Sequence, residues 1–350
     1  MIEKDRLRLA LIGCGYFARY HAAAWRVIPQ VELVAVCDRA PERAQAFAEQ
    51  FDVPRYYTNP EALFRAERLD IVDIVTTPES HRELVELAAR YGVHVICQKP
   101  MALSEADCVA MVESCERAGV SFMVHENFRW QRIFRRARTL TEAIGEPFFL
   151  RLWFRSHYDV FARQPYLATA ERFIILDLGV HLLDLARFLM RDEFSTLYCI
   201  TQRVHPQIRG EDVATILLRS RRGAAASIEL SYASFAPREL FPQTLALIEG
   251  PLGTVLVEAD GLLRLITSSG HTEERLAPPS LPWQEPPGEW IQEAVLAIQQ
   301  HFVDCLRRGL MPETHGRDNL RTMQLVFAAY RSADTTSSIA LDQSESERRG

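Results

Sequence analysis

Short apolar runs alternate with longer amphipathic stretches along the first third of the chain. The runs at residues 7–12, 31–36, 71–75, 94–97 and 121–124 predict buried strands. Helical patterns lie between them, at residues 16–28, 80–91 and 104–117 and from Pro41 onward. Strands separated by helices of about 10 to 15 residues are typical of βαβ units. This part of the sequence therefore predicts an α/β domain with a doubly wound parallel sheet.

The second half of the chain has shorter runs separated by turn residues. They lie at residues 147–154, 196–202, 212–219, 224–232, 244–249, 253–258 and 262–268, and their rough alternation predicts a largely antiparallel sheet. A proline-rich loop is expected at 278–287, and helices are expected at 293–308 and 317–330. The change of pattern predicts two domains, residues 1–128 and 129–342, followed by a disordered tail at 343–350.

Composition and charge narrow the class of protein. A chain of 350 residues is long enough for two domains, since single cores rarely grow beyond about 250 to 300 residues. The formal net charge of −6 argues against a nucleic acid or an anionic membrane as partner. No apolar stretch approaches the roughly 18 residues of a membrane span, and the charged first residues do not predict a signal peptide. The seven cysteines form no C-x-x-C pair, which favours reduced thiols and a cytoplasmic protein.

The turn after the first predicted strand carries a dinucleotide-binding fingerprint. Residues 13–18, GCGYFA, have the form G-x-G-x-x-A, in which Gly13 permits the tight turn and Gly15 lets the backbone approach a pyrophosphate. The helix that follows would offer its free N–H groups to the phosphates. The second strand ends at Asp38, about where an acid binds the adenosine ribose. A carboxylate there favours NAD, whereas the neighbouring Arg39 could accept the extra phosphate of NADP, so NADP stays open. The alternative to cofactor binding is a purely structural glycine turn.

A second polar pattern lies in the helical stretch at residues 177–187. Asp177 and His181 are four residues apart and Asp184 lies three further on, so a continuous helix places them on one face, opposite a row of leucines. A carboxylate can orient the histidine ring and stabilise its charged form, as general acid–base catalysis requires. The alternatives are a surface ion-pair network, a buried histidine with a structural acid, and a metal site. No further placed ligand supports a metal.

Lysine is nearly absent from this chain. Of 40 basic residues only Lys4 and Lys99 are lysines, and Lys99 follows an apolar run. Lysine can lose its proton near neutral pH and arginine cannot, so retention of lysine at one position indicates a function there. Chance retention is the alternative.

Together these features resemble the Gfo/Idh/MocA oxidoreductase family over nearly the whole chain. The residues that carry the resemblance are 13–18 with His21, Asp38, Thr76-Thr77-Pro78 followed by His81, Lys99-Pro100, Asn127-Phe128-Arg129, and 177–181 with Asp184. Members of that family have a Rossmann domain, an α/β domain with a large open sheet, and C-terminal helices that return to the first domain. They use a nicotinamide cofactor to oxidise a secondary alcohol of a sugar, sugar acid or cyclitol, or to reduce the ketone. The resemblance also implies a homodimer or homotetramer.

The resemblance assigns roles to individual residues. The catalytic set is Lys99, Asp177 and His181, with His181 as the general base, Asp177 holding its ring and Lys99 stabilising alkoxide character. The expected cofactor contacts are Gly13, Gly15, Tyr16, Phe17, Asp38, Arg39, Thr76, Thr77, Pro78, His81, Gln98, Lys99, Asn127 and Arg129. The expected substrate contacts are Arg155, His157, Tyr158, Arg163 and Asp184, and no metal is expected.

Two departures from the family pattern affect these assignments. The lysine usually follows a glutamate, but Gln98 stands here, so an anion that would favour the protonated lysine is missing. A glycine cluster often precedes the aspartate, but this chain has ERFIIL at residues 171–176, which prevents transfer of a substrate by analogy. Arginines before it suit a carboxylate-bearing sugar, or are surface charges. Two other functions remain open: a dinucleotide-binding regulator or sensor, and a glycoside-processing enzyme that uses NAD transiently.

Overall fold

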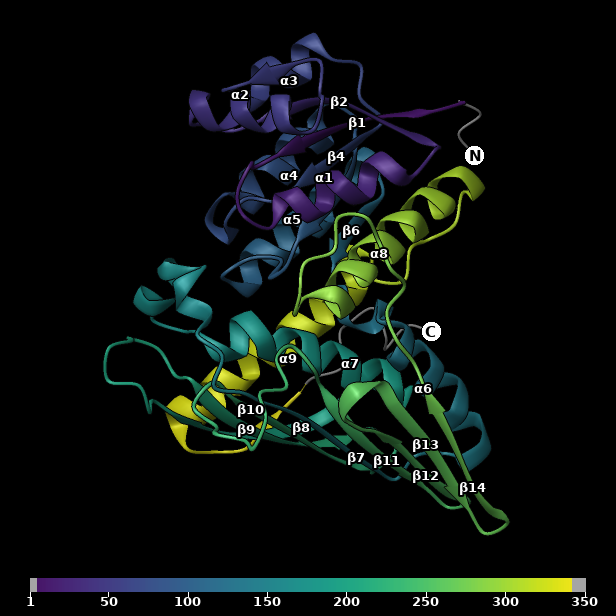
Figure 1. Cartoon of the computed structure of the whole chain (residues 1–350). Coiled ribbons are helices and arrows are strands. Elements are labelled where there is room, and N and C mark those ends of the chain that lie inside the picture. The colour runs from purple at the N-terminus through teal and green to yellow at the C-terminus, as the bar shows by residue number, and fades with distance from the viewer. Residues whose placement is uncertain (1–4, 342–350) are drawn as a thin grey trace. The chain divides into compact units, whose positions relative to one another are not determined.

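The computed structural model describes residues 5–341, and the chain divides into two compact units (Figure 1). The first unit comprises the residues up to Asn127, Leu281–Gln284 and Gln292–Met323, and the second comprises Phe128–Ser280, Glu285–Ile291 and the residues from Gln324 onward. The division after Asn127 lies close to the expected boundary, but two segments from the expected second domain group with the first unit. The expected tail at 343–350 lies outside the described residues.

The first unit contains a parallel sheet with the strand order β3-β2-β1-β4-β5-β6. The strands are β1 Leu7–Ile12, β2 Val31–Cys37, β3 Tyr56–Tyr57, β4 Ile71–Ile74, β5 His94–Gln98 and β6 Phe122–His125. Strand order reverses between β1 and β4, and dinucleotides bind beyond the carboxyl ends of the strands at such a reversal. The predicted doubly wound sheet is confirmed.

Capping residues mark the ends of helices in this unit, as α5, Glu105–Ala118, shows. They are α1 Ala18–Val27, α2 Pro41–Gln50, α3 Pro60–Ala66, α4 His81–Arg90 and α5 Glu105–Ala118. At α5, Ser104 Oγ accepts the N–H of Asp107 at 3.1 Å, and Gly119 takes a left-handed conformation just past the end. The short elements β3 and α3 were not predicted, because two strand residues and a two-turn helix leave little periodicity to detect.

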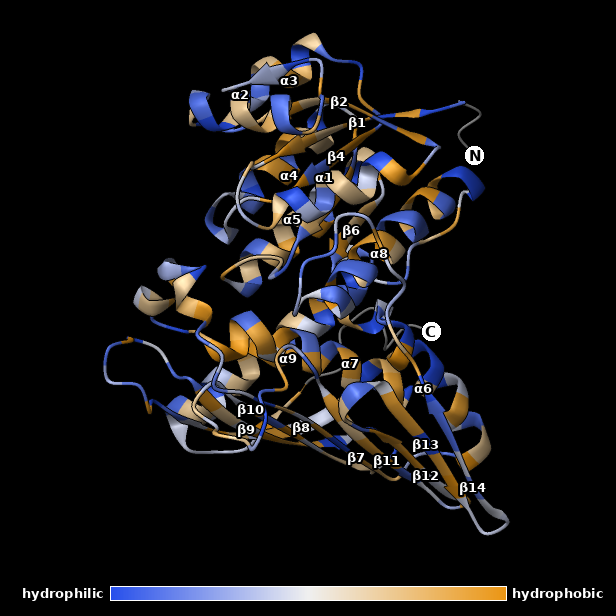
Figure 2. Cartoon of the chain, in the orientation of Figure 1, coloured by the Kyte–Doolittle hydropathy of each residue, from blue (hydrophilic) through white to orange (hydrophobic). Residues whose placement is uncertain are grey.

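The second unit is built on a mostly antiparallel sheet, as predicted. Its order is β14-β13-β12-β11-β7-β10-β9-β8-β15, and among the pairs of this sheet β7 and β10 are parallel. The strands are β7 Phe149–Arg155, β8 Phe194–Gln202, β9 Val213–Ser220, β10 Ala225–Ser231, β11 Leu245–Gly250, β12 Gly253–Val257, β13 Leu262–Thr267, β14 Gly270–Arg275 and β15 Ile339–Ala340. In Figure 2, β12 and β13 are hydrophobic whereas the edge strand β14 is hydrophilic, which discourages pairing with another chain.

Two helices cover the same side of this sheet (Figure 1). Helix α6, Arg132–Ile144, packs on β11, β12 and β13, and helix α7, Val180–Met190, packs on β7 and β10. Helix α6 was not predicted, although its buried Ile133, Phe134, Ala137 and Ile144 have helical spacing. The C-terminal helices α8, Glu289–Arg308, and α9, Gly316–Thr335, are longer than expected. Among the described residues, no helix combines the length and apolar character needed to cross a bilayer.

The helix expected from residue 177 starts differently. Ile175–Gly179 form a single π-helical turn, and the α-helical geometry of α7 begins only at Val180. The expected apolar and polar faces are also wrong, since α7 is buried almost all round. A sequence pattern cannot show a π-turn, because its wider hydrogen-bond ring depends on which partners the tertiary structure supplies.

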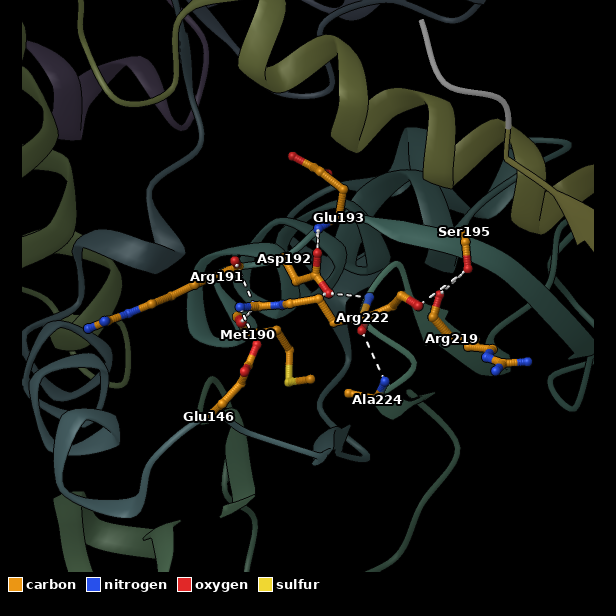
Figure 3. A network of polar contacts seen from close by, with 10 residues as sticks. Glu146, Met190, Arg191, Asp192, Glu193, Ser195, Arg219, Arg222 and Ala224 are labelled. Atoms are coloured by element: carbon orange, nitrogen blue, oxygen red, sulfur yellow. Dashed lines mark hydrogen bonds and ion pairs between the residues drawn. The ribbon is translucent and has the colours of Figure 1, made fainter. Parts of the chain in front are cut away.

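The C-terminal end of α7 is held by Arg222 (Figure 3). Its guanidinium donates to the carbonyl oxygens of Met190 and Arg191 at 2.9 Å each, and its backbone N–H donates to Asp192 Oδ2 at 3.0 Å. An ion pair to Glu146 completes the group. The last carbonyls of a helix lack partners within it, so this arginine caps the helix with a cation at its negative end.

Candidate active site

The glycine turn between β1 and α1 leaves room for a pyrophosphate. Gly13 has a φ of +99°, and a Cβ there would lie 2.7 Å from the carbonyl group of Val75, so a larger residue would displace the end of β4. A Cβ on Gly15 would meet nothing within 4 Å, and Gly15 and Tyr16 are exposed. The turn is thus tight on its protein side and open on its outer side. This arrangement fits the phosphates of a dinucleotide at the start of a helix.

Asp38 joins this turn to the one that follows β2. Its Oδ2 accepts the N–H of Cys14 and its Oδ1 accepts the N–H of Ala40, each at 2.9 Å, and Arg43 lies at 3.5 Å from the carboxylate. The adjacent Arg39 is exposed. A carboxylate held at this point suits the ribose hydroxyls of NAD and repels the extra phosphate of NADP.

His81 connects the loops that follow β4 and β5. Its Nδ1 lies 3.1 Å from the carbonyl oxygen of Pro100 and 3.2 Å from that of Met101, and its Nε2 lies 3.1 Å from that of Thr76. The ring is completely buried, and burial lowers its pKa. His81 was expected at the cofactor, and its hydrogen bonds join the segment at Thr76 to the segment at Pro100 and Met101.

A buried chain of hydrogen bonds leads to Lys99. The backbone N–H of Lys99 donates to Gln98 Oε1 at 2.7 Å, and Gln98 Nε2 lies 3.1 Å from His21 Nε2. His21 Nδ1 lies 2.8 Å from Asp73 Oδ2, which also accepts the indole N–H of Trp25 at 2.6 Å. The side chains of Gln98, His21, Asp73 and Trp25 are buried. The segment that carries Lys99 is therefore tied to the centre of the first unit.

The chemistry of these groups determines which atom donates and which accepts in each of these hydrogen bonds. A buried carboxylate accepts, so His21 Nδ1 carries the proton and His21 Nε2 is left as an acceptor. Gln98 supplies both an N–H for His21 and an oxygen for the Lys99 amide. A glutamate would present an acceptor to each of them. The departure at Gln98 thus fits a His21 ring that donates through Nδ1 and accepts through Nε2.

The second unit contains Asp177 and His181. His181 is buried, and its ring stacks on Phe128 at 3.9 Å between centroids with 5° between planes. Asp177, in the π-turn, is partly exposed and lies near Tyr232, since burial and then Asp177 raise the pKa of that phenol well above its usual range. Stacking fixes the plane of the imidazole, as a positioned base requires.

Asp184 and Arg129 pair with each other in this unit. Arg129 Nε donates to Asp184 Oδ2 at 2.7 Å and Nη2 donates to Oδ1, and Asp184 is completely buried. The sequence suggested Arg129 for the cofactor and Asp184 for the substrate. In the structure the two residues bind each other, which agrees with the alternative of a structural acid, because a buried carboxylate needs a matched cation.

The remaining substrate candidates lie near the end of β7 and the loop after it. Arg155, His157 and Arg163 are exposed, whereas Tyr158 is half-buried and stacks on Phe241 at 3.9 Å. His157 packs against Phe235 at 3.8 Å. Among the described residues, no three His, Cys, Asp or Glu side chains are grouped to hold a metal ion.

Sequence reasoning missed two acidic residues of the second unit, Glu211 and Asp212. Asp212 is completely buried and accepts from His205 Nδ1 at 2.5 Å, and Glu211 contacts the segment that leads into the π-turn. The run Gly210-Glu211-Asp212 between two strands was a weak signal, since paired acids after a glycine occur in many turns.

Asp38→Asn should shift cofactor preference toward NADP. The amide keeps one of the two acceptor oxygens and removes the charge that repels a 2′-phosphate, so the ratio of kcat/KM for NADP to that for NAD should rise roughly tenfold. Steady-state kinetics with both cofactors measures the ratio. Asp70→Asn is the matched control, because Asp70 also accepts a backbone N–H, from Arg8, but near the amino end of β4. An unchanged ratio in Asp38→Asn would show that Asp38 does not select the cofactor.

Gln98→Glu should destabilise the protein at about pH 8. Two acceptors would then face each other between residue 98 and His21, at a cost of about 1–3 kcal/mol in the free energy of unfolding. Urea denaturation measures this difference. Gln45→Glu is the control, since exposed Gln45 also donates to an acceptor, Glu49, and a like-charge pair on a helix surface costs only about 0.2–0.5 kcal/mol. Equal stability of Gln98→Glu and the wild type would contradict the assigned direction of the chain.

Comparison with known proteins identifies the family. Residues 7–126 match the family model for the oxidoreductase family with an NAD-binding Rossmann fold, and residues 134–255 match the model for its C-terminal domain. A D-apiose dehydrogenase from Paraburkholderia graminis is 51% identical, with 98% of this chain and 92% of the relative aligned. A second, from Rhizobium rhizogenes, is 48% identical, with 95% and 96% aligned.

A solved structure agrees with these relatives. The crystal structure of an oxidoreductase from Agrobacterium radiobacter in complex with NAD+, L-tartaric acid and magnesium has a TM-score of 0.94 and 47% identity, and the match covers 96% of this chain and 98% of that one. The residues of the glycine turn and Asp38 fit the same cofactor. The chain belongs to the Gfo/Idh/MocA family and is an NAD-dependent oxidoreductase acting on the CH–OH groups of sugar-like substrates.

Proposed function

We propose that this protein oxidises D-apiose with NAD+. The observation that carries the proposal is the 51% and 48% identity to two D-apiose dehydrogenases over 98% and 95% of the chain. Such coverage includes the second unit, in which the substrate contacts are expected. By contrast, a myo-inositol 2-dehydrogenase from Thermotoga maritima is 25% identical over 96% of the chain.

The ligands of the solved relative support a small polyhydroxylated substrate. L-tartaric acid, present with NAD+ in that structure, has neighbouring hydroxyl groups on a short carbon chain. D-apiose is likewise a short sugar with neighbouring hydroxyls. In its cyclic form the carbon that bears the anomeric hydroxyl also bears a hydrogen. Loss of that hydrogen as hydride and of the hydroxyl proton gives a lactone.

Each residue of the proposed site has one task in this reaction. NAD+, when bound, accepts the hydride from the sugar carbon. His181 takes the hydroxyl proton, and Asp177 stabilises the imidazolium that forms. The ammonium of Lys99 donates a hydrogen bond to the sugar oxygen as negative charge develops on it. The Gln98–His21–Asp73 chain supports this task by fixing the backbone of Lys99.

We also infer a homodimer or homotetramer in the cytoplasm. On the face of the nine-stranded sheet that alternates with buried Cys199 and Ile216, the side chains of Ile200 and Leu217 are 51% and 53% exposed. Association of such faces removes apolar surface from water. All seven cysteines are unpaired and buried, which supports a reducing compartment.

Incubation of the protein with D-apiose, other pentoses, inositols and sugar acids in the presence of NAD+ tests the substrate. We expect the largest kcat/KM with D-apiose, with NADH accumulating in step with a lactone identified by NMR. A larger kcat/KM with another sugar would overturn the substrate assignment. Product without NADH would instead indicate transient redox, and binding of NAD+ without turnover of any sugar would favour a regulator.

Lys99→Ala and His181→Ala should each lower kcat by about 10²–10⁴. Neither change removes the glycine turn or Asp38, so the Kd for NAD+ measured by calorimetry should stay within a factor of about three. Lys99→Arg keeps the charge but changes its shape and should also fail to restore turnover. Exposed His271 on β14 supplies the control variant His271→Ala. Near wild-type kcat in Lys99→Ala or His181→Ala would refute the role of that residue.

A further inference from the structure

We propose that Glu211 and Tyr330 form a clamp that positions the acid–base segment of the second unit. They are positioning residues for Asp177 and His181, and the inference rests on the proposed function for its effect on turnover. Neither residue belongs to the segment itself. Glu211 precedes β9, and Tyr330 lies in α9, in the part of that helix that belongs to the second unit.

The clamp binds four successive backbone amides, those of residues 173–176. Glu211 accepts the N–H of Phe173 at 3.1 and 3.2 Å through its two carboxylate oxygens and that of Ile175 at 3.2 Å through Oε1. Its backbone carbonyl accepts the N–H of Ile174 at 3.1 Å. The phenol oxygen of Tyr330 accepts the N–H of Leu176 at 3.1 Å.

The two clamp residues also bind each other. Tyr330 donates its phenol hydrogen to Glu211 Oε1 at 2.8 Å. Burial, followed by the charge of Glu211, raises the pKa of Tyr330 well above its usual range, so the phenol stays protonated and able to donate. One hydroxyl thus links the carboxylate to the Leu176 amide, and loss of either residue disturbs the same group of bonds.

These amides need partners because they open a helix. The first four N–H groups of a helix have no acceptor within it, and a negative charge there is favourable. Short polar side chains usually cap one or two of these groups. Here the residues before the π-turn, Phe173 and Ile174, have apolar side chains that cannot accept a hydrogen bond from these N–H groups. Glu211 and Tyr330 supply the acceptors from two other segments, which fixes the helix start relative to both.

The backbone at Glu211 is pinned on both sides. A Cβ on Gly210 would lie 2.9 Å from the carbonyl oxygen of Ala170 and 3.0 Å from the nitrogen of Phe173, so only glycine allows this approach. On the other side Asp212 accepts the N–H of Val204 at 2.7 Å. The carboxylate of Glu211 therefore reaches the helix start from a rigid support.

Displacement of this support would reach the catalytic groups directly. Asp177 follows the last clamped amide, and its own N–H donates to the carbonyl of Phe173 at 2.9 Å. His181 lies one turn further on. A shift of about 1 Å in a catalytic group can lower a rate about a hundredfold. We therefore expect loss of the clamp to lower kcat more than it weakens cofactor binding. The glycine turn and Asp38, which are the expected cofactor-binding features, belong to the first unit and not to the unit that contains the clamp.

Glu211→Gln and Tyr330→Phe, singly and together, test the clamp in the full-length protein. Each variant should lower kcat with D-apiose at least about fivefold and leave the Kd for NAD+ unchanged. The double variant should be little worse than the more damaged single variant, because the two side chains act through one group of bonds. Hydrogen–deuterium exchange at the amides of residues 173–176 should rise in every variant.

Asp192→Asn is the matched control. Asp192 also accepts a backbone N–H, that of Arg222, but beyond the opposite end of α7 (Figure 3). It should lower thermal stability by an amount similar to Glu211→Gln without changing kcat. When Asp192→Asn is combined with Glu211→Gln, the two losses of stability should add, and kcat should stay that of Glu211→Gln alone. Wild-type kcat in both Glu211→Gln and Tyr330→Phe, or unchanged exchange at residues 173–176, would overturn the clamp.

The exchange measurement separates this inference from the proposed function. If the wild type does not oxidise D-apiose, the substrate assignment fails, whereas faster exchange confined to residues 173–176 still supports the clamp. The kcat comparison is then made with the sugar that gives the largest rate in the substrate screen. If D-apiose is oxidised and the variants match the wild type in rate and exchange, the clamp fails and the substrate assignment stands.

Discussion

The completely buried carboxylate of Asp73 is the constraint on which the first unit's site depends. A charge removed from water is costly unless donors surround it, and Trp25 and His21 supply two of them. Because Asp73 accepts a hydrogen bond from His21 Nδ1–H, the other ring nitrogen is left as the acceptor, and the side-chain N–H of Gln98 donates to it. The side-chain oxygen of Gln98 is then free to accept the backbone N–H of Lys99, which is the last hydrogen bond of this series. A single buried carboxyl group in the sheet thereby determines which residue type suits the position before the lysine.

The second unit uses the same principle at two places. Asp184 is completely buried and is matched by Arg129, so a residue that resembles part of an acid–base face serves as structural support. Glu211 is matched by backbone amides and by Tyr330 instead of a cation. In both cases a carboxylate holds the helix that carries His181, one near its middle and the other at its start. At the far end of α7, away from Asp177 and His181, Arg222 caps the last carbonyls with a cation.

These supports explain why the site tolerates an irregular helix start. A π-turn leaves its amides and carbonyls less regularly paired than an α-helix does, and such turns occur frequently at functional sites. The ion pairs and capping groups around residues 173–191 lie in segments far apart in sequence. They hold Asp177 and His181 on consecutive turns while most of α7 is buried. Rigid support of this kind is what general base catalysis requires from a protein scaffold.

The sequence by itself determined the features that depend on neighbours along the chain. The glycine turn, Asp38, the parallel strands of the first unit and the alternation of β7 to β13 follow from local sterics and from periods of two or about 3.6 residues. Tertiary structure decided the rest, because it concerns partners far apart in sequence. Gln98 meets His21 across 77 positions, Arg129 meets Asp184 across 55, and Tyr330 meets Glu211 across 119. No local pattern records such pairs, so only the fold shows that Asp184 pairs with Arg129 and that Glu211 and Tyr330 bind the segment before Asp177.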